Sequence, residues 1–227
     1  MKTIFVTASG TELGKTFVST ALVRQLRAQG LKVRALKPVV SDITADNYAG
    51  SDTALIIEAL GEAQDEKTID AVSPWRFEPA LSPDMAARRE GRSIDFEELI
   101  RFCEEGRKGD HDVTVIEGVG GLMVPLDDQH LVRDWMARLA QTAPLEIAVV
   151  VGAYLGTVSH SLTTLSTLRE VGLDPKVVIV SERDPGPVPL AETMETIARF
   201  APGVNFIGVP QQTEDAPAMP DLTAALL

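Results

Sequence analysis

The fold is decided by residues 3–16, which read Thr3-Ile4-Phe5-Val6-Thr7-Ala8-Ser9-Gly10-Thr11-Glu12-Leu13-Gly14-Lys15-Thr16. The apolar residues 3–7 predict a buried strand. From Thr16 to Gln29 the apolar side chains recur at helical spacing, and Gly30 follows as a helix stop. A strand, a glycine-containing loop, Lys-Thr and a helix are, in this order, typical of a phosphate-binding loop. Backbone N–H groups and the helix N-terminus hold phosphate oxygens in such a loop.

The loop also predicts roles for single side chains. Lys15 is expected to reach the β- and γ-phosphates of a nucleotide, and the Thr16 hydroxyl to ligate Mg²⁺. Only three residues separate Gly10 from Gly14, where the usual motif has four, and Ser9 stands where the first glycine should be. A Gly-Lys-Thr helix start that merely follows a strand is the alternative. The flanking strand and helix favour the loop, so we expect nucleotide contacts from Thr11, Glu12, Leu13, Gly14, Lys15 and Thr16.

Length and composition set the class of protein. The 227 residues are enough for one sizeable α/β domain, and we assign residues 1–227 to it. With 21 Lys and Arg against 33 Asp and Glu, the net charge of −12 argues against nucleic acid as the main partner, although one local loop can still bind a nucleotide. Cys103 is the single cysteine, which excludes an internal disulfide. With no long apolar run, the chain is expected to be cytoplasmic and to have no membrane partner.

Short runs rich in Val and Ile recur along the chain and alternate with helical patterns. Such runs are typical of strands buried on both faces of a parallel sheet, and the alternation predicts a doubly wound α/β fold of the P-loop NTPase type with a mostly parallel sheet. Residues from Thr68 to Gly109 are less regular and predict a helical insertion over the sheet. The expected strands are Thr3–Thr7, Val33–Lys37, Val113–Glu117, Glu146–Val151, Lys176–Val180 and Asn205–Val209.

Two acidic residues are candidate metal ligands. Glu117 ends a predicted strand and is followed by Gly118-Val119-Gly120-Gly121, and ligands of open α/β sheets bind at the carboxyl ends of strands. Asp52 opens the helical stretch Thr53–Leu60. With Thr16, these acids would give Mg²⁺ a few oxygens, leaving phosphates and water to supply the rest. The alternatives are a solvated strand-end Glu117 and an Asp52 that only complements the helix dipole.

A second lysine, Lys37, stands at the carboxyl end of the next predicted strand, in Lys37-Pro38-Val39-Val40-Ser41. Pro38 fixes the direction of the chain beyond it. The residue pattern alone leaves two interpretations equally open. Lys37 is either a second cation at the site or a surface lysine whose stem lies along the strand end.

Taken together, these segments resemble the dethiobiotin synthetases, and they occur in the order and at the spacing of that family. Lys37-Pro38-Val39 and the Glu-Gly-x-Gly-Gly segment are the specific parts, whereas the phosphate loop and Ser51-Asp52 are shared with other P-loop enzymes. The matching segments are Thr11–Thr16, Lys37–Val39 with Ser41, Ser51-Asp52, Ser82-Pro83, Glu117–Gly121 with Pro125-Leu126, and Val151-Gly152 with Leu155-Gly156 and His160.

The resemblance implies a reaction. ATP, CO₂ and 7,8-diaminononanoate give dethiobiotin, ADP and phosphate through a carbamate and a carbamic–phosphoric anhydride, with Mg²⁺. Positioning and charge neutralisation are what such a reaction needs. The resemblance makes Lys37 and Lys15 the catalytic residues, and Lys37 the group that stabilises the carbamate.

The resemblance also implies contact residues and a partner. Ser41 would contact the diamine side of the substrate. The helix starting at Gly156, Thr157, Val158 and Ser159 would hold the substrate carboxylate in the site of a second subunit, which implies a homodimer. His160 is expected to pack at that helix start. Further nucleotide contacts are implied for Asp52, Glu117, Gly118, Val119, Gly120, Ser181, Pro210 and Gln211.

The chain departs from the family pattern at five positions. Ala8 stands where glycine is usual and Gly10 where Asp is common, so a glycine has moved within the loop. Asp84 replaces a frequent His. Ser181 stands where the family has a base-contacting Asn, and Gln211 where an aromatic residue is common. The departure at Ser181 leaves the preference for a nucleotide base open.

Three rival functions fit parts of the pattern. A P-loop switch ATPase of the partition or division-site type carries a signature lysine at the loop position of Gly10, and its partner surfaces are often basic. A cobyrinate-type amidating ligase needs a cysteine nucleophile, and Cys103 lies in a helical stretch without a nucleophile elbow. A non-catalytic nucleotide-binding module has no use for Asp52 and Glu117 together.

Overall fold

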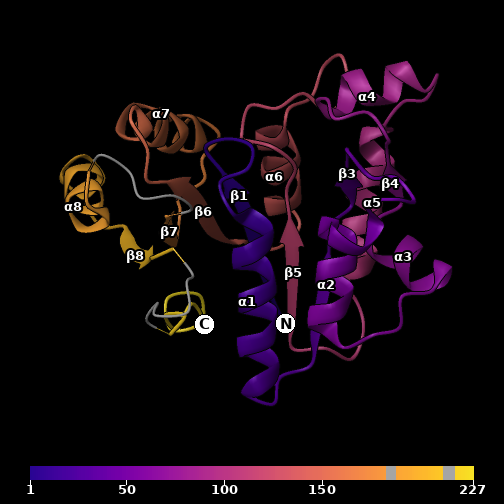
Figure 1. Cartoon of the computed structure of the whole chain (residues 1–227), viewed down its shortest axis with the longest axis horizontal. Coiled ribbons are helices and arrows are strands. Elements are labelled where there is room, and N and C mark those ends of the chain that lie inside the picture. Colours follow the sequence, from indigo (N-terminus) through magenta and orange to yellow (C-terminus); the bar gives the residue numbers. More distant parts are fainter. Residues whose placement is uncertain (183–187, 212–217) are drawn as a thin grey trace.

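A six-stranded parallel sheet forms the centre of the computed structural model, which describes residues 1–182, 188–211 and 218–227. The strand order is β2-β5-β1-β6-β7-β8, with every neighbouring pair parallel, and Figure 1 labels all of these strands except β2. The carboxyl ends of all six strands therefore lie along one edge. The strands are β1 (Lys2–Ala8), β2 (Val33–Leu36), β5 (Val113–Glu117), β6 (Glu146–Gly152), β7 (Val177–Ser181) and β8 (Asn205–Val209).

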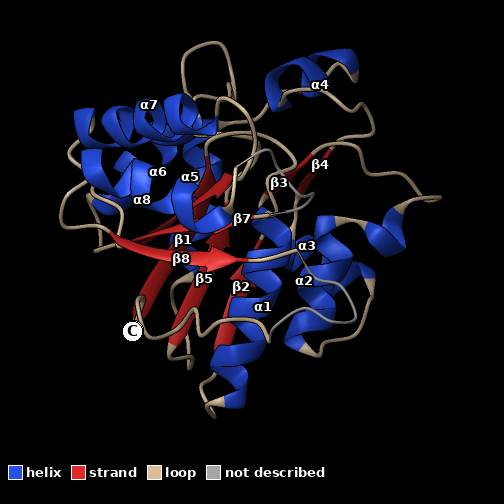
Figure 2. Ribbon diagram, turned by 60° about the vertical axis from the view of Figure 1, so that its left-hand side comes forward, coloured by secondary structure: helices blue, strands red, loops and turns tan. Residues whose placement is uncertain are grey.

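Helices cover both faces of this sheet (Figure 2). One face carries α1 (Lys15–Ala28), α2 (Asp52–Leu60) and α3 (Glu66–Val72). The opposite face carries α5 (Phe96–Gly106), α6 (Val132–Ala140), α7 (Thr157–Glu170) and α8 (Leu190–Phe200). The predicted doubly wound α/β fold is confirmed.

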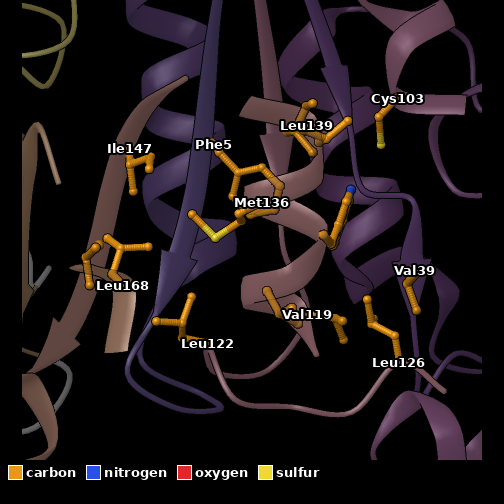
Figure 3. Close-up of a cluster of buried hydrophobic side chains, with 14 of the residues drawn as sticks. Phe5, Val39, Cys103, Val119, Leu122, Leu126, Met136, Leu139, Ile147 and Leu168 are labelled. Carbon is orange, nitrogen blue, oxygen red and sulfur yellow. The ribbon is translucent and has the colours of Figure 1, made fainter. Parts of the chain in front are cut away.

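Alternation along β1 divides the core between the two faces. Phe5 points toward α6, where its ring lies edge-on to Trp135 at 4.9 Å between centroids. Ile4 and Val6 point the other way, into the cluster that holds Leu22 of α1. The Phe5 side of this core is shown in Figure 3. Because β1 is apolar on both faces, it can be buried between two layers of helices, as the strands of parallel sheets are.

A small second sheet lies beside the main one and carries two loops. The strands β3 (Val39–Val40) and β4 (Trp75–Arg76) pair in parallel. Beyond them, the Ile43 amide donates to the Phe77 carbonyl at 3.2 Å and so links the segment after β3 to the segment after β4. The 3-10 turn η1 (Tyr48–Gly50) and helix α4 (Pro83–Arg89) follow the two strands. The Asp42 amide also donates to the Pro79 carbonyl at 3.3 Å, so the segments that follow β3 and β4 are joined to each other.

The predicted elements agree with the structure to within two residues at their ends. The run expected at Lys176–Val180 is β7, Val177–Ser181, and the helix expected from Thr16 to Gln29 is α1, Lys15–Ala28. The helical insertion at 68–109 is confirmed by α4, α5 and most of α3, but β4 inside it escaped the sequence pattern. Across the described ranges, no helix is long and apolar enough to cross a membrane.

The last residues pack against α1. Leu222 and Leu226 are fully buried in the cluster on that face of the sheet. Gln25 of α1 donates from its amide to the Pro220 carbonyl at 2.8 Å and accepts from the Leu222 amide at 2.9 Å. The helix that begins at the phosphate loop is therefore supported along its flank by the carboxyl-terminal segment.

Candidate functional site

The phosphate loop joins β1 to α1 through a glycine in the left-handed region. Gly14 has φ 90° and forms the N-cap of α1. A Cβ built there would lie 2.9 Å from the Ser181 hydroxyl oxygen, so both φ and space require glycine. The amide groups of the first turn of α1 are left for a ligand, because no side chain caps this helix.

Lys15 is held under the loop. Its side chain is buried, and its ammonium donates to the Gly10 carbonyl at 3.2 Å. Burial and the nearby Lys37 lower the pKa of Lys15 to about 8, while Glu117 and Asp52 act in the opposite direction. A desolvated lysine with one carbonyl partner can gain much from a phosphate anion.

Thr16 joins two carboxylates at the start of α1. Its hydroxyl lies 2.6 Å from Asp52 Oδ1 and 2.8 Å from Glu117 Oε1. Asp52 is in place because Ser51 caps α2, accepting from the Ala54 amide at 3.2 Å. Burial raises the pKa of Asp52, but Lys37 and the Thr16 hydrogen bond outweigh this and hold it below its usual value. The three predicted metal-ligand residues lie together.

Strand pairing brings Lys37 to Glu117. Leu36 of β2 pairs with Ile116 of β5, so the residues that follow lie side by side at the carboxyl edge. The Lys37 ammonium donates to Glu117 Oε1 at 2.6 Å and to the Gly118 carbonyl at 2.8 Å, and it lies 3.0 Å from Asp52 Oδ2.

Lys37 is 1% exposed, so the alternative of a surface lysine is wrong. Burial lowers its pKa, but the Asp52 and Glu117 carboxylates more than offset this and raise the pKa of Lys37 above its ordinary value. Lys37 is therefore a buried, permanently charged ammonium at the edge of the site.

The chemistry of these oxygens fits a magnesium ion. Glu117 Oε2 is buried and has no hydrogen-bond partner among the described residues. Two carboxylates and a hydroxyl are hard oxygen donors, which suit Mg²⁺. In the described ranges no group of three or more His, Cys, Asp or Glu side chains could hold a metal. A cation at Thr16, Asp52 and Glu117 would need water and phosphate oxygens to complete its shell.

Lys15, Thr16, Lys37 and Asp52 line one cleft of about 1230 Å³. Of the predicted nucleotide and metal contacts, it is lined by Thr11, Glu12, Gly14, Lys15, Thr16, Asp52, Val119, Gly120, Ser181, Pro210 and Gln211. Lys37 and Ser41 line it as well. Leu13, Glu117 and Gly118 do not appear in its lining, although Glu117 and the carbonyl of Gly118 both accept from Lys37.

Two of the predicted nucleotide contacts, Ser181 and Gln211, lie at one end of this cleft. Ser181 ends β7, and the amide of Gln211 lies 3.4 Å from a carboxylate oxygen of Glu182. Glu182 also lines the cleft, and sequence reasoning missed it. The contact between Glu182 and Gln211 links the segments after β7 and β8, so their positions depend on one another.

The opposite end of the cleft is formed by the loops of the small sheet. Ser41 follows β3, and its neighbour Asp42 has φ 60°, a left-handed conformation that Asp tolerates. Apolar side chains from β3, α2, α4, the loop before α4 and the segment after β5 also line the cleft. Sequence reasoning missed most of them, and only the Ser82-Pro83 pair offered a signal. They are Val40, Leu55, Ala80, Leu81, Met85 and Val124.

The predicted carboxylate-binding helix start lies outside this cleft. Gly156 is the left-handed N-cap of α7, and neither it nor Thr157, Val158 or Ser159 lines the cleft of the single chain. The Thr157 hydroxyl donates back to the Gly152 carbonyl. Next to it, Leu155 is 86% exposed.

The residue expected to pack at this helix start has a partner. A ring nitrogen of His160 lies 2.8 Å from the Tyr154 hydroxyl, and the two rings are tilted against each other. This contact joins the first turn of α7 to the loop that precedes it.

Comparison with known proteins adds sequence relatives. The family profile described as AAA domain matches residues 2–215. The chain is 42% identical to an ATP-dependent dethiobiotin synthetase of Acidiphilium cryptum, with 88% of each chain covered. It is 43% identical to one of Methylobacterium nodulans, covering 92% of this chain and 93% of that one. It is 40% identical to one of Caulobacter vibrioides, and the match covers 99% of this chain and 100% of that one.

Solved structures share the fold at low sequence identity. A MinC:MinD cell division protein complex of Aquifex aeolicus matches with a TM-score of 0.54 and 14% identity, over 94% of this chain and 83% of that one. Chloroplast FtsY of Physcomitrella patens matches with a TM-score of 0.50 and 15% identity, and the match spans 93% of this chain and 59% of that one. These likenesses concern the fold alone.

Proposed function

The chain belongs to the family of ATP-dependent dethiobiotin synthetases, and on this premise we propose that it converts 7,8-diaminononanoate, CO₂ and ATP to dethiobiotin, ADP and phosphate. The relatives' names give the ATP dependence and the product. The route through a carbamate and the use of Mg²⁺ are our proposal. It treats residues 1–227 as one catalytic domain.

Three bond-forming steps make up the proposed route. One amine attacks CO₂ and loses a proton, giving a carbamate. A carbamate oxygen then attacks the γ-phosphorus, and the bond from that phosphorus to the bridging oxygen breaks, releasing ADP. The second amine finally attacks the carbonyl carbon and loses a proton, phosphate leaves, and the cyclic urea closes. No protein nucleophile is needed, so the protein contributes position and charge.

The buried pair of lysines is the observation that carries this proposal. Lys15 and Lys37 are both buried, and they lie close enough for the Lys37 ammonium to lower the pKa of Lys15. Once a metal ion neutralises Asp52 and Glu117, two ammonium groups in one cleft favour a ligand set with concentrated negative charge. A triphosphate and a carbamate would supply it, with Lys15 on the β- and γ-phosphates and Lys37 on the carbamate and the transferred phosphoryl group.

Magnesium fits the same end of the cleft through Thr16, Asp52 and Glu117. When held by these residues, the ion would supply positive charge that neutralises the phosphate oxygens of the nucleotide. The Thr16 hydroxyl lies within 2.8 Å of both carboxylates, which supports their acting on one ion. The protein holds these oxygens in position because each starts or ends a helix or strand of the sheet.

The other end of the cleft suits an aliphatic acceptor. Ser41 would contact the amine end, and apolar side chains such as Leu81 and Met85 would lie along the hydrocarbon chain. We further propose that Gly156–Ser159 at the start of α7 bind the substrate carboxylate in a second copy of the chain, so the enzyme acts as a homodimer. Its cytoplasmic location remains a prediction, as does its choice of nucleotide base.

A switch ATPase of the division-site type is the second candidate, since the fold is shared with the MinC:MinD complex. That likeness rests on 14% identity, against 40% or more for the synthetases. The buried Lys37 between two carboxylates favours the synthetase, because a nucleotide alone has less need of a second buried cation.

One experiment tests the proposal directly. The purified chain is incubated with diaminononanoate, bicarbonate, ATP and Mg²⁺, and dethiobiotin is sought by mass spectrometry while ADP release is followed. Dethiobiotin should form, and ADP release should rise when diamine and bicarbonate are both present. ATP hydrolysis that ignores the diamine, with no product of dethiobiotin mass, would favour the switch.

A further inference from the structure

The ammonium of Lys37 has no hydrogen-bond donor left for a substrate. A lysine ammonium has three N–H donors. Three acceptors surround Lys37 Nζ: Glu117 Oε1 at 2.6 Å, the Gly118 carbonyl at 2.8 Å and Asp52 Oδ2 at 3.0 Å. In this arrangement Lys37 is a structural cation, and stabilising a carbamate would require it to give up at least one of these contacts.

Two of those three acceptors belong to the proposed metal ligands. Asp52 and Glu117 each give one oxygen to Thr16 and face Lys37 at the same time, and Glu117 Oε1 serves both. A divalent ion bound by these carboxylates would lie close to the ammonium. Two cations that share buried ligands repel each other strongly, so they compete for the carboxylates.

The backbone of Lys37 is fixed, but its side chain can change partners. The Lys37 amide donates to the Val72 carbonyl at 3.0 Å, and the Trp75 amide donates to the Pro38 carbonyl at 3.1 Å. The side chain itself borders the cleft. A change of rotamer would therefore carry the ammonium from the carboxylates into the cleft without moving the strand.

We propose that the Lys37 ammonium occupies the place of the metal ion in the nucleotide-free protein, where it neutralises Asp52 and Glu117. A divalent cation that binds to these carboxylates would displace the ammonium into the cleft. The inference rests on the proposed function, since it takes these carboxylates as metal ligands. It adds an order to the reaction, because Lys37 becomes available to the acceptor only once the metal has taken its place. Binding of the metal ion would thus move the Lys37 ammonium to the position where it can contact the acceptor.

Metal binding without nucleotide tests this exchange. Mn²⁺ is titrated into nucleotide-free protein and followed by calorimetry and by the electron paramagnetic resonance of free Mn²⁺. Lys37→Met, which keeps the length of the side chain but removes the competing charge, should bind Mn²⁺ on the order of tenfold more tightly than wild type. Lys108→Met, an exposed lysine, should match wild type. Equal or weaker Mn²⁺ binding by Lys37→Met would overturn the proposal.

A second measurement follows the wild-type protein, and either of two Lys37 variants can serve to assign its signal. Lysine side chains are labelled with ¹⁵N at Nζ, and the buried Lys37 ammonium is assigned by its absence from the Lys37→Met spectrum, or from that of Lys37→Arg. Adding Mg²⁺ without nucleotide should shift this signal or broaden it through faster proton exchange. A signal that stays unchanged at saturating Mg²⁺ would mean that both cations bind together, and the proposal would be wrong.

Neither measurement contains ATP or the diamine, so this inference and the proposed function can fail separately. If the chain makes dethiobiotin but Lys37→Met binds Mn²⁺ no more tightly than wild type, the proposed function stands and the proposed exchange of cations is wrong. Tighter Mn²⁺ binding by that variant in a chain that makes no dethiobiotin would support the exchange and overturn the assigned reaction.

Discussion

Gly121 lies directly against the backbone of Gly10: a Cβ built on Gly121 would stand 3.1 Å from both the N and the Cα atoms of Gly10. The glycine segment after β5 thus packs on the phosphate loop, main chain against main chain. Gly10 is the glycine that is displaced in this loop relative to the usual motif. Its position is set from outside the loop, by a residue more than a hundred positions away.

Gly121→Ala should therefore weaken ATP binding, because the added methyl group pushes on backbone atoms that cannot rotate away. We expect a loss on the order of tenfold in affinity, the scale of a few tenths of an ångström of misplacement in a preorganised site. Calorimetry with ATP and Mg²⁺ measures it, and a thermal melt checks that the fold survives. Wild-type affinity would mean that the loop shifts without consequence.

Lys15→Ala and Thr16→Val should each abolish turnover while the fold stays intact. Lys15→Ala removes the charge expected on the β- and γ-phosphates, and Thr16→Val removes a metal-ligand oxygen at nearly constant volume. The loss of rate should be about 10²-fold or more for each variant. Steady-state ADP release measures the rate, and circular dichroism serves as the control for folding. Near-normal turnover in either variant would refute the phosphate-loop assignment for that residue.

Asp52→Asn and Glu117→Gln should each raise the Mg²⁺ concentration needed for half-maximal activity, because each removes one anionic oxygen ligand. The effect should be larger for Glu117→Gln, since Glu117 is buried whereas the Asp52 side chain is 38% exposed. Activity titrated against Mg²⁺ gives both curves. If both variants matched wild type, the two acids would serve only to hold Thr16 and Lys37.

Lys37→Gln should leave ATP binding nearly unchanged while lowering dethiobiotin formation by about 10²-fold or more, the scale for losing one preorganised charge. The reason is that its proposed partner is the carbamate, whereas Lys15 holds the nucleotide. Calorimetry with ATP and kinetics with the diamine are run side by side. Equal losses in both would make Lys37 a general phosphate anchor.

ATP binding should take up protons in alkaline solution. Lys15 has a pKa of about 8 in the nucleotide-free protein, so it is largely neutral near pH 9. Phosphate oxygens favour its charged form and raise its pKa, so binding draws in part of a proton near pH 9 and almost none near pH 6.5. Apparent affinity should accordingly fall as pH rises above about 8.

Calorimetry in two buffers of different ionisation enthalpy measures this uptake. Lys15→Ala supplies the control, because it should show little buffer dependence near pH 9 even if it binds ATP more weakly. A wild-type heat that is independent of buffer near pH 9 would mean that Lys15 is already fully charged there in the free protein.

Most of the fold could be predicted from the sequence, because strands buried on both faces leave apolar runs and their helices leave glycine stops. The order of the strands could not. Lys37 and Glu117 are 80 positions apart, and only the pairing of β2 with β5 makes them neighbours. That is why the sequence left Lys37 open between a site residue and a surface lysine.

The β3–β4 pair escaped prediction for a different reason. Each strand has two residues, which is too short for any periodicity to appear. The left-handed backbone of Asp42 is equally invisible, since Asp adopts that conformation only where surrounding contacts hold it. The substrate end of the cleft was therefore the least predictable part, with Ser41 as its main signal.

The small sheet of β3 and β4 separates a part of the cleft that tolerates substitution from a part that does not. The phosphate end of the cleft rests on β1, β5 and α1, whose buried residues pack on both sides and tolerate little substitution. The acceptor end rests on residues 41–50 and 78–85, which follow the two short strands β3 and β4. A lineage could thus exchange one acceptor for another by editing two loops, while inheriting its machinery for activating ATP without alteration.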